Sequence, residues 1–408
     1  MSGHSLLTPL LLTHLCLFRQ LSLSNNRLCG VWVHFGTQKG NYNAEGINAI
    51  ADALRVNGAL TKLSLARNKL EEAGTKAICE AIEQNTTLKE LDISDDWHGG
   101  HTGGSAGAKH VAQMLRVNGT LTSLKLRGNQ LGDKGWGAIF AAICGNKDSK
   151  IMSLNAASEN IGPAGGKLIA EALRTSVTSA LTRVNVRGNN IEGDVAMQLS
   201  ATVLGNLKIE MFNEIPIKEM RANSFTELDL KGKLVGVVGG MVVAGLIPIM
   251  GALTVANLLG NELDAESAKM LAEVAKQKGI SLCGIQRDQT TADFSNQNLK
   301  LPDAILLASD LSQADVTGAR TSLNLSSNNL CSVTETGYIK VSQVQGSSFN
   351  EGDNVVYQGK EMIVSKAIDR DGDIKMRNLP DMSGLKALAN ALRVNGALTK
   401  IRYVSPRT

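Results

Sequence analysis

Aromatic residues are scarce in this chain, where Trp 3, Tyr 4 and Phe 7 make up only 3% of 408 residues. Most globular cores use more rings, so we expect a core built mainly from Leu, Ile, Val and Ala. The cysteines form no CxxC pair, which excludes a disulfide-dense scaffold and a cysteine-rich zinc module. We expect all six to be small buried apolar residues in a reducing compartment: Cys16, Cys29, Cys79, Cys144, Cys283 and Cys331.

An excess of one sign of charge is also missing. Lys+Arg 42 stand against Asp+Glu 38, which gives a formal net charge of +4. A dedicated nucleic-acid binder would concentrate basic residues, so we predict no nucleic-acid partner. The sequence has no GxxxxGK[ST] phosphate-binding loop, and all six His residues fall within the first 110 positions. We predict that the chain is not an enzyme and takes no cofactor.

The chain does contain an internal repeat. The segment ALRVNGALTK occupies Ala53–Lys62 and returns letter for letter at Ala391–Lys400, with a near copy at Met114–Leu124. Each complete copy leads into the pattern LxxLxLxxNxL, followed by apolar residues at helical spacing. The Asn turns of these patterns are Asn26, Asn68, Asn129, Asn189, Asn261 and Asn328.

This pattern predicts a repeating unit of one short strand, an Asn turn and one α-helix. Alternating strand Leu residues would pack against the apolar face of the unit's own helix. Neither element can bury that face alone, so neighbouring units must stack and share a core. The Asn side chain is expected to satisfy backbone groups where the chain leaves the strand.

Because of these repeats, residues 21–335 resemble the ribonuclease-inhibitor-like class of leucine-rich repeats. The same class forms the arrays of NOD-like receptors and of Ran GTPase-activating proteins. The resemblance implies an α/β solenoid, a horseshoe with parallel strands on its concave face and helices on its convex face. It covers the array alone, because a nucleotide-binding loop is missing from the sequence, and it is weakly specific for function.

The repeat pattern is interrupted near the C-terminal end. Residues 336–379 show strand alternation with turn signals and resemble a small SH3-like β-barrel or a hairpin. We expect strands at Val355–Tyr357, Met362–Ala367 and Asp373–Met376, with Asp371-Gly372 as a hairpin turn. Residues 380–408 read as a resumed, truncated repeat, which suggests a shortened array or an end that a partner covers.

Two apolar segments raise the question of a membrane. Residues 1–20 include Leu6–Phe18, which we interpret as the remnant of an N-terminal repeat helix or as a weak signal-like segment. Leu234–Leu259 carries no charge and is long enough to span a bilayer. It falls where the repeat requires a helix and then a strand, so we expect a cytoplasmic protein without a membrane span.

The outward-pointing strand positions are the predicted partner-binding site. They alternate between acidic and basic, which suits a protein surface better than a nucleic acid. We therefore predict a non-catalytic scaffold that binds a protein partner on its concave face, or else a solvated face without a ligand. The predicted contact residues are Arg67, Glu90, Asp92, Asp95, Lys125, Arg127, Arg183, Arg187, Asp229 and Lys231.

Two alternative functions follow from other features. Resemblance to the Ran activators implies regulation of a small GTPase, for which Arg67 is the nearest candidate arginine. A membrane-associated array would use Leu234–Leu259.

A weak metal-like cluster follows one strand. Asp96, His98 and His101 combine a carboxylate with two imidazoles three residues apart. A closed site needs more ligands than this stretch supplies. We therefore predict no metal here, and read the stretch as a Gly-rich insertion between a strand and its helix.

Overall fold

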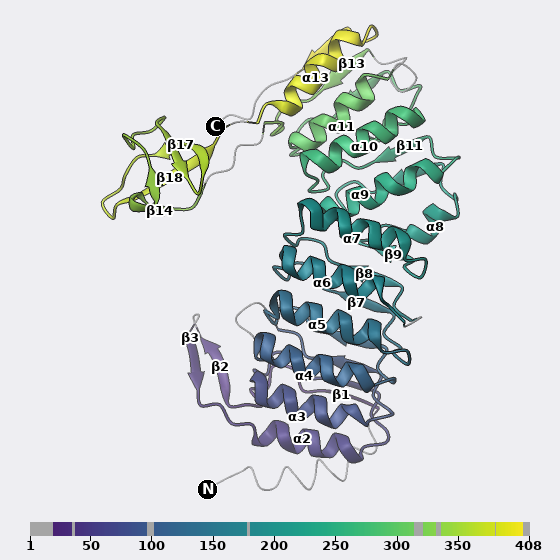
Figure 1. Cartoon of the computed structure of the whole chain (residues 1–408), viewed down its shortest axis with the longest axis vertical. Helices are drawn as coiled ribbons and strands as arrows, with labels where there is room; N and C mark the ends of the chain where they lie inside the picture. The colour runs from purple at the N-terminus through teal and green to yellow at the C-terminus, as the bar shows by residue number, and fades with distance from the viewer. Residues whose placement is uncertain are drawn as a thin grey trace. The chain divides into compact units, whose positions relative to one another are not determined.

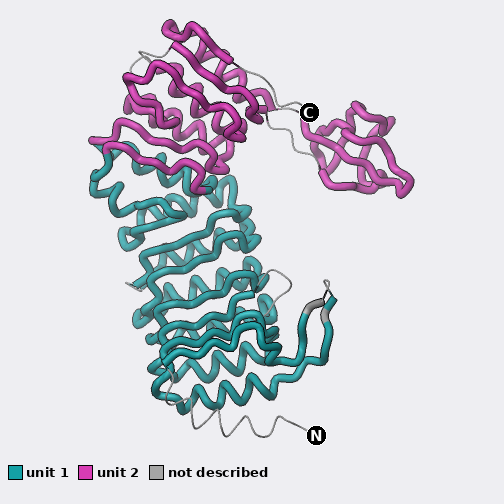
Figure 2. The backbone as a smooth tube through the Cα atoms, turned by 180° about the vertical axis from the view of Figure 1, so that it is seen from behind, with its two compact units in different colours: residues 1–225, 234–251 teal, residues 226–233, 252–408 magenta. Residues whose placement is uncertain are grey.

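The computed structural model describes residues 19–34, 37–95, 102–177, 180–313, 321–331, 336–379 and 381–402. They fall into two compact units, one of residues 1–225 and 234–251 and the other of residues 226–233 and 252–408 (Figure 2). In each unit, short parallel strands lie on one side and α-helices on the other (Figure 1). This is the strand-and-helix unit that the repeats predict, and it makes the fold an α/β solenoid.

The first unit contains two parallel sheets, with strand orders β1-β4-β5-β6 and β7-β8-β9. The middle residues of the strands stand in register, as Leu63, Leu91 and Leu124 do, and at most 7% of these side chains is exposed. The strands are β1 (Gln20–Ser22), β4 (Lys62–Ser64), β5 (Glu90–Asp92), β6 (Ser123–Lys125), β7 (Ser153–Asn155), β8 (Arg183–Asn185) and β9 (Met211–Phe212). The helices are α2 (Glu45–Val56), α3 (Glu71–Glu83), α4 (Gly104–Val117), α5 (Gly132–Gly145), α6 (Pro163–Arg174), α7 (Gly193–Gly205), α8 (Ile217–Arg221) and α9 (Gly236–Leu246).

The uncharged segment forms a helix, a short turn and a strand, as the repeat requires. Helix α9 is followed by the 3-10 turn η2 (Ile247–Ile249) and by strand β11 (Val255–Asn257). Most of α9 is buried against its neighbours, which explains why it is apolar all round instead of amphipathic. Among the described residues, no helix is both long enough and apolar enough to cross a membrane.

The second unit repeats the same architecture. Its parallel sheets have the strand orders β10-β11 and β12-β13-β19. The elements besides β11 are β10 (Glu227–Asp229), α10 (Ala265–Lys278), β12 (Thr291–Asp293), α11 (Leu301–Leu311), β13 (Ser322–Asn324), α13 (Ser383–Val394) and β19 (Lys400–Arg402).

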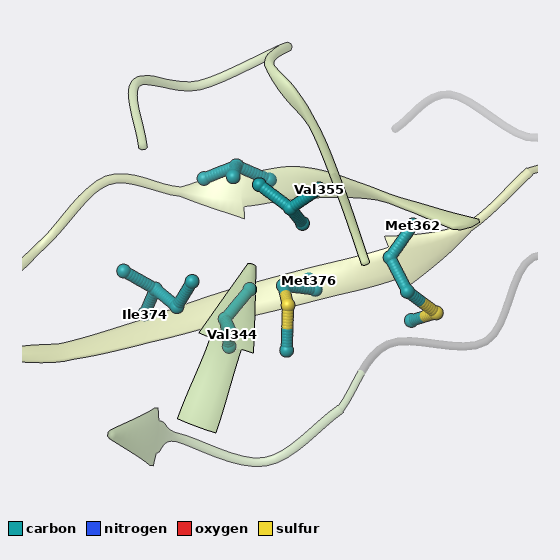
Figure 3. Packing of buried hydrophobic residues seen from close by; sticks show 6 residues of the cluster. Val344, Val355, Met362, Ile374 and Met376 are labelled. Atoms are coloured by element: carbon teal, nitrogen blue, oxygen red, sulfur yellow. The ribbon is translucent and has the colours of Figure 1, made fainter. Parts of the chain in front are cut away.

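Residues 336–379 form a separate β-structure with its own core. The strand order β14-β18-β17-β16-β15 is antiparallel throughout and brings β14 and β15, which follow each other in the chain, to opposite edges. Six buried side chains fill its interior, among them Val344, Val355 and Ile374 (Figure 3). An SH3-like barrel is compatible with this nearly closed sheet and stays a prediction. The strands are β14 (Ile339–Lys340), β15 (Val344–Gln345), β16 (Asn354–Tyr357), β17 (Lys360–Lys366) and β18 (Asp373–Asn378).

This β-structure is inserted inside one repeat, between its strand and its helix. Strand β13 and the turn at Asn328 precede it, and helix α13 completes the same repeat after it. Strand β19 then pairs with β13 in parallel register, and Asn395 Nδ2 donates to Leu311 O at 2.9 Å across the interruption. The resumed repeat therefore stacks directly on the repeat before the insert.

The structure also contains elements that the sequence did not predict. A hairpin of β2 (Val31–His34) and β3 (Thr37–Gly40) is inserted at the corresponding place of the first described repeat, before α2. The short repeat of β9 and α8 was missed because its strand has only two residues and its helix only five. Strands β14 and β15 were missed for the same reason, since each has two residues.

Candidate functional site

The Asn turns hold neighbouring repeats together through side-chain amides. Asn68 Nδ2 donates to Leu65 O in its own repeat at 2.9 Å and to Leu23 O in the preceding repeat at 2.7 Å. Its Oδ1 accepts from Asn26 N and Leu28 N at 2.8 and 3.3 Å. One fully buried amide thus satisfies four backbone groups. The same donor pair recurs at Asn129, Asn189, Asn261 and Asn328.

Asn26 differs from the other Asn turns. Its side chain is exposed, and its Nδ2 donates to Ser24 O within its own turn. The residues before Arg19, which include the predicted helix remnant, lie outside the described part of the chain.

A second set of Asn residues links the helix ends, and the sequence reading missed its role. Asn85 Nδ2 donates to Leu54 O of the preceding helix at 3.0 Å, and its Oδ1 accepts from Leu88 N at 2.8 Å. Part of the signal was available, since two members of this set, Asn118 and Asn395, are the N of the repeated RVNG motif. The other members are Asn118, Asn146, Asn206 and Asn395.

Both Asn sets fix the strand face, by which we mean the outward-pointing side chains of the parallel strands. In the first unit this face is hollowed into a groove of about 360 Å³ over β1, β4, β5 and β6. Small hydroxyl side chains lie between the charged ones. The polar lining is Gln20, Ser22, Lys62, Ser64, Glu90, Asp92, Ser123 and Lys125.

The charges of this groove neutralise one another between neighbouring strands. Lys62 Nζ lies 2.8 Å from Glu90 Oε1, and Lys125 Nζ lies 3.7 Å from Asp92 Oδ2. Both pairs join residues that are direct partners in the parallel register. The predicted contact residues Glu90, Asp92 and Lys125 are therefore brought together as paired charges, with Arg67 and Arg127 exposed at the ends of the same strands.

Asp95 does not belong to this face, which corrects the expectation from the sequence. Its side chain is only 1% exposed and makes an ion pair with Lys69 Nζ at 2.6 Å. Asp95 continues the two-residue spacing of the buried Leu91 and Ile93, so the alternation along the strand places its side chain on the inner side. Removing either partner would leave a buried charge without compensation.

Arg183 and Arg187 lie on the strand face of β8, where a second groove of about 220 Å³ opens. Arg183 is exposed, whereas Arg187 is half-buried and lies 3.6 Å from Glu214 Oε1. Polar side chains again dominate the lining, which consists of Ser153, Asn155, Arg183, Val184, Asn185, Met211 and Glu214.

Asp229 and Lys231 lie on the strand face of the second unit. Lys231 Nζ donates to Gln297 Oε1 at 2.8 Å, and Asp229 Oδ1 accepts from Lys231 N at 3.1 Å. Both side chains are exposed. They are held by neighbours of the same unit and so present a preorganised polar surface.

The weak metal candidates Asp96, His98 and His101 lie outside the described residues. Within the part of the chain that the structure describes, no group of three or more His, Cys, Asp or Glu side chains could hold a metal ion.

One local pattern has the spacing of a hydrolase nucleophile elbow and was missed in the sequence. It is Gly103-Gly104-Ser105-Ala106-Gly107. Ser105 is exposed in the first turn of α4, and that turn does not directly follow a strand. The nearest described imidazole in sequence, His110, lies 3.4 Å from Glu72 Oε1. The pattern therefore lacks the strand–turn–helix context that would make it a nucleophile.

The described cysteines are free thiols, and four of them are buried. Burial raises the pKa of Cys29 and of Cys144 to about 11. It also raises the pKa of Cys79. The four buried thiols are small core residues, as the sequence predicted. Cys331 is only half-buried, which corrects that expectation for this residue, and Cys16 lies outside the described residues.

Comparison with known proteins identifies the repeats. A family model described as Leucine Rich repeat matches residues 117–140. The chain is 32% identical over 160 residues to NACHT, LRR and PYD domains-containing protein 5 of Bos taurus, covering 38% of this chain and 13% of that protein. It is 34% identical over 93 residues to the ribonuclease inhibitor of Sus scrofa, covering 22% of this chain and 19% of that protein. The matches thus span less than a quarter of either relative.

Solved structures also include similar chains. The leucine-rich repeat-containing protein LegL7 from Legionella pneumophila matches with a TM-score of 0.30 and 17% identity, covering 76% of this chain and 83% of that one. The actin-binding site 2 of leiomodin-1 matches with a TM-score of 0.28 and 16% identity, covering 48% and 87%. Scores below 0.5 support no inference, so the assignment rests on the repeats themselves, the family model and the sequence relatives. The chain is therefore similar to leucine-rich-repeat proteins of the ribonuclease-inhibitor-like class.

Proposed function

We propose that this chain is a non-catalytic interaction protein that binds another protein on its strand face. The observation that carries this proposal is the groove over β1, β4, β5 and β6, whose charged side chains are held in register by two Asn sets. A surface that is already ordered loses little conformational entropy on binding. Its alternating charges offer specificity to a partner with a complementary pattern, because a mismatched partner meets like charges.

The relatives support a protein as the ligand. The name of the ribonuclease inhibitor states that it acts on an enzyme, which is a protein. A small molecule is a poorer fit, because the grooves on the strand face of the first unit are open, whereas small-molecule sites enclose most of their ligand. The partner's own surface is expected to supply hydrogen bonds to Ser22, Ser64 and Ser123 in the lining of the groove.

A capture experiment with charge-reversal variants tests this proposal. The test variant carries Lys125→Glu, Arg127→Glu and Arg183→Glu, all exposed on the strand face of the first unit. The control variant carries Lys109→Glu, Lys134→Glu and Lys167→Glu, which change the charge equally on the exposed faces of α4, α5 and α6.

A partner that binds the parent and the control is expected to bind the test variant at least about tenfold more weakly, which corresponds to a loss of about 1.4 kcal/mol. Circular dichroism must show that both variants remain folded. Equal capture by all three proteins would refute binding on the strand face. Loss of partner binding in the control variant alone would show that the site lies on the helices.

A further inference from the structure

The insert of residues 336–379 is a self-contained module. Its buried residues form a cluster of their own (Figure 3). Phe349 and Tyr357 add partly buried rings to this cluster. The array closes across the insert through the pairing of β13 with β19. The insert is therefore not needed to complete the stack of repeats, which leaves its outer surface available for a separate role.

One outer face of the module combines an exposed ring with three cations, and we call it the Tyr338 patch. It consists of Tyr338, Lys366, Lys375 and Arg377. Lys375 Nζ lies 4.7 Å from the centre of the Tyr338 ring, and Lys366 Nζ donates to the Tyr338 hydroxyl oxygen at 2.8 Å. Arg377 is exposed two residues beyond Lys375 on β18, and so points to the same side of the sheet.

The ammonium groups of this patch make no ion pair among the described residues, although Asp369 and Glu351 attract Lys366 from farther away. Lys366 and Lys375 are direct partners in the register of β17 and β18, an arrangement that costs free energy because like charges face each other. Among the described residues, no carboxylate lies within 4 Å of either ammonium group. Lys340 on the neighbouring strand β14 differs from these two lysines because it makes an ion pair, with its Nζ 3.1 Å from Asp373 Oδ1. An anion that lies between the two lysines is attracted by both ammonium groups.

We propose that the Tyr338 patch binds a short acidic peptide segment of a partner protein. Carboxylate side chains would accept hydrogen bonds from Lys366, Lys375 and the bidentate guanidinium of Arg377. The half-exposed Tyr338 ring offers apolar area beside them, 48% of the residue being accessible. The peptide's charges would thus relieve the repulsion across β17 and β18.

The overall charge of the module favours a peptide over a nucleic acid. Residues 336–379 contain six basic and six acidic side chains, so their net charge is zero. A polyanion with a charge at every nucleotide would meet the acidic loop residues Asp369 and Asp371 as well as the patch. A short peptide with a few carboxylates matches a patch of three cations.

Fluorescence anisotropy of a labelled peptide tests this site in the full chain. The probe is a fluorescein-labelled octapeptide of alternating Glu and Gly, titrated at low salt. The test variant is Lys366→Ala with Lys375→Ala, which removes both ammonium groups from the patch, and circular dichroism must show that it remains folded. The control is Lys360→Ala, an exposed lysine at the opposite end of β17.

The parent and the Lys360→Ala variant are expected to bind equally, and the test variant at least tenfold more weakly. Tyr338→Phe is expected to weaken binding less, because the ring remains. No binding at low salt, or equal weakening in the control, would overturn the proposal. Patch-dependent binding of oligo(dT) in preference to the peptide would overturn it in favour of a nucleic acid. The outcome is independent of the strand-face proposal, since none of its residues belongs to the patch.

Discussion

Single Asn side chains determine how the repeats stack. A side chain at this position donates two hydrogen bonds to backbone carbonyls, and at Asn68 it also accepts two from backbone N–H groups. Asn68 does so with its amide fully buried. No other short side chain has both functions in one planar group, so the residue type follows from the geometry.

Replacing Asn68 with Ala is expected to lower the free energy of unfolding by about 3 kcal/mol or more, because buried backbone groups at the turn lose their partners. Urea denaturation followed by circular dichroism measures the change. Asn26→Ala is the matched control, since Asn26 is exposed and bonds within its own turn. Its cost should stay near 0.5 kcal/mol. Equal costs at the two positions would show that the amide does not link repeats.

The two Asn sets also show which residues the sequence could reveal. Asn68 and its equivalents were predictable, because each stands at a fixed distance from the strand Leu residues. Asn85 belongs to the second set, and its role depends on the carbonyl of Leu54, which is 31 residues away. The ion pair of Asp95 depends on Lys69, which belongs to the preceding repeat, in the same way. Contacts between repeats cannot be read from the pattern within one repeat.

At the scale of elements, the leucine pattern predicted the strands of the complete repeats and failed where the chain departs from it. The hairpin of β2 and β3 lies in a stretch without leucine spacing, and β9 is too short to show alternation. The strand face could be predicted because side chains alternate along a strand. Its grooves and ion pairs could not, because they depend on the register between strands.

The parallel strands of the first unit are interrupted between β6 and β7, and this interruption coincides with a change at a single residue. Among the described strands, no ladder joins β6 to β7, and the repeat of β7 carries Glu159 in place of the turn Asn. Glu159 is 6% exposed, and its Oε1 accepts from Gly128 N at 2.9 Å. An ionised carboxylate has no hydrogen to donate, so it cannot replace the two donor bonds of Asn. Burial raises the pKa of Glu159, and the bond from Gly128 opposes this.

Replacing Glu159 with Gln is expected to raise the free energy of unfolding at neutral pH by about 1 kcal/mol, because the amide accepts from Gly128 and also donates. The raised pKa fixes the sign of the pH dependence. Protonation of Glu159 stabilises the folded parent at pH values below the ordinary pKa of Glu. This stabilisation is lost as the pH rises through the raised pKa that Glu159 has in the folded state. The advantage of the variant should therefore be largest at pH 7 and shrink towards pH 4.

Urea denaturation of the parent and the Glu159→Gln variant at pH 4 and pH 7 measures this difference. Glu171→Gln provides the control, since Glu171 is exposed on α6. An advantage that is the same at both pH values would contradict the assigned role of the carboxylate.

At the scale of the whole molecule, two insertions occupy the same place in their repeats. The hairpin of β2 and β3 and the module of residues 336–379 both follow a strand turn and precede a helix. Loops at this position can lengthen without disturbing the stack, because strand and helix still meet their neighbours through the Asn sets. The repeats thus act as a scaffold that accepts additions at one place.

Deleting residues 332–380, so that Cys331 is joined to Asp381, tests whether the array is independent of the insert. The shortened chain is expected to retain its helical circular dichroism, because β13, α13 and β19 keep the pairing that they have across the insert. Hydrogen exchange should show that Leu398 N, which bonds to Asn395 Oδ1 at 3.0 Å, stays protected. Strand-face capture should persist while binding of the acidic peptide is lost. Loss of protection at Leu398 together with unfolding of α11 would mean that the insert contributes to the stability of the array, because the repeats on either side of the insert would then be unable to stack without it.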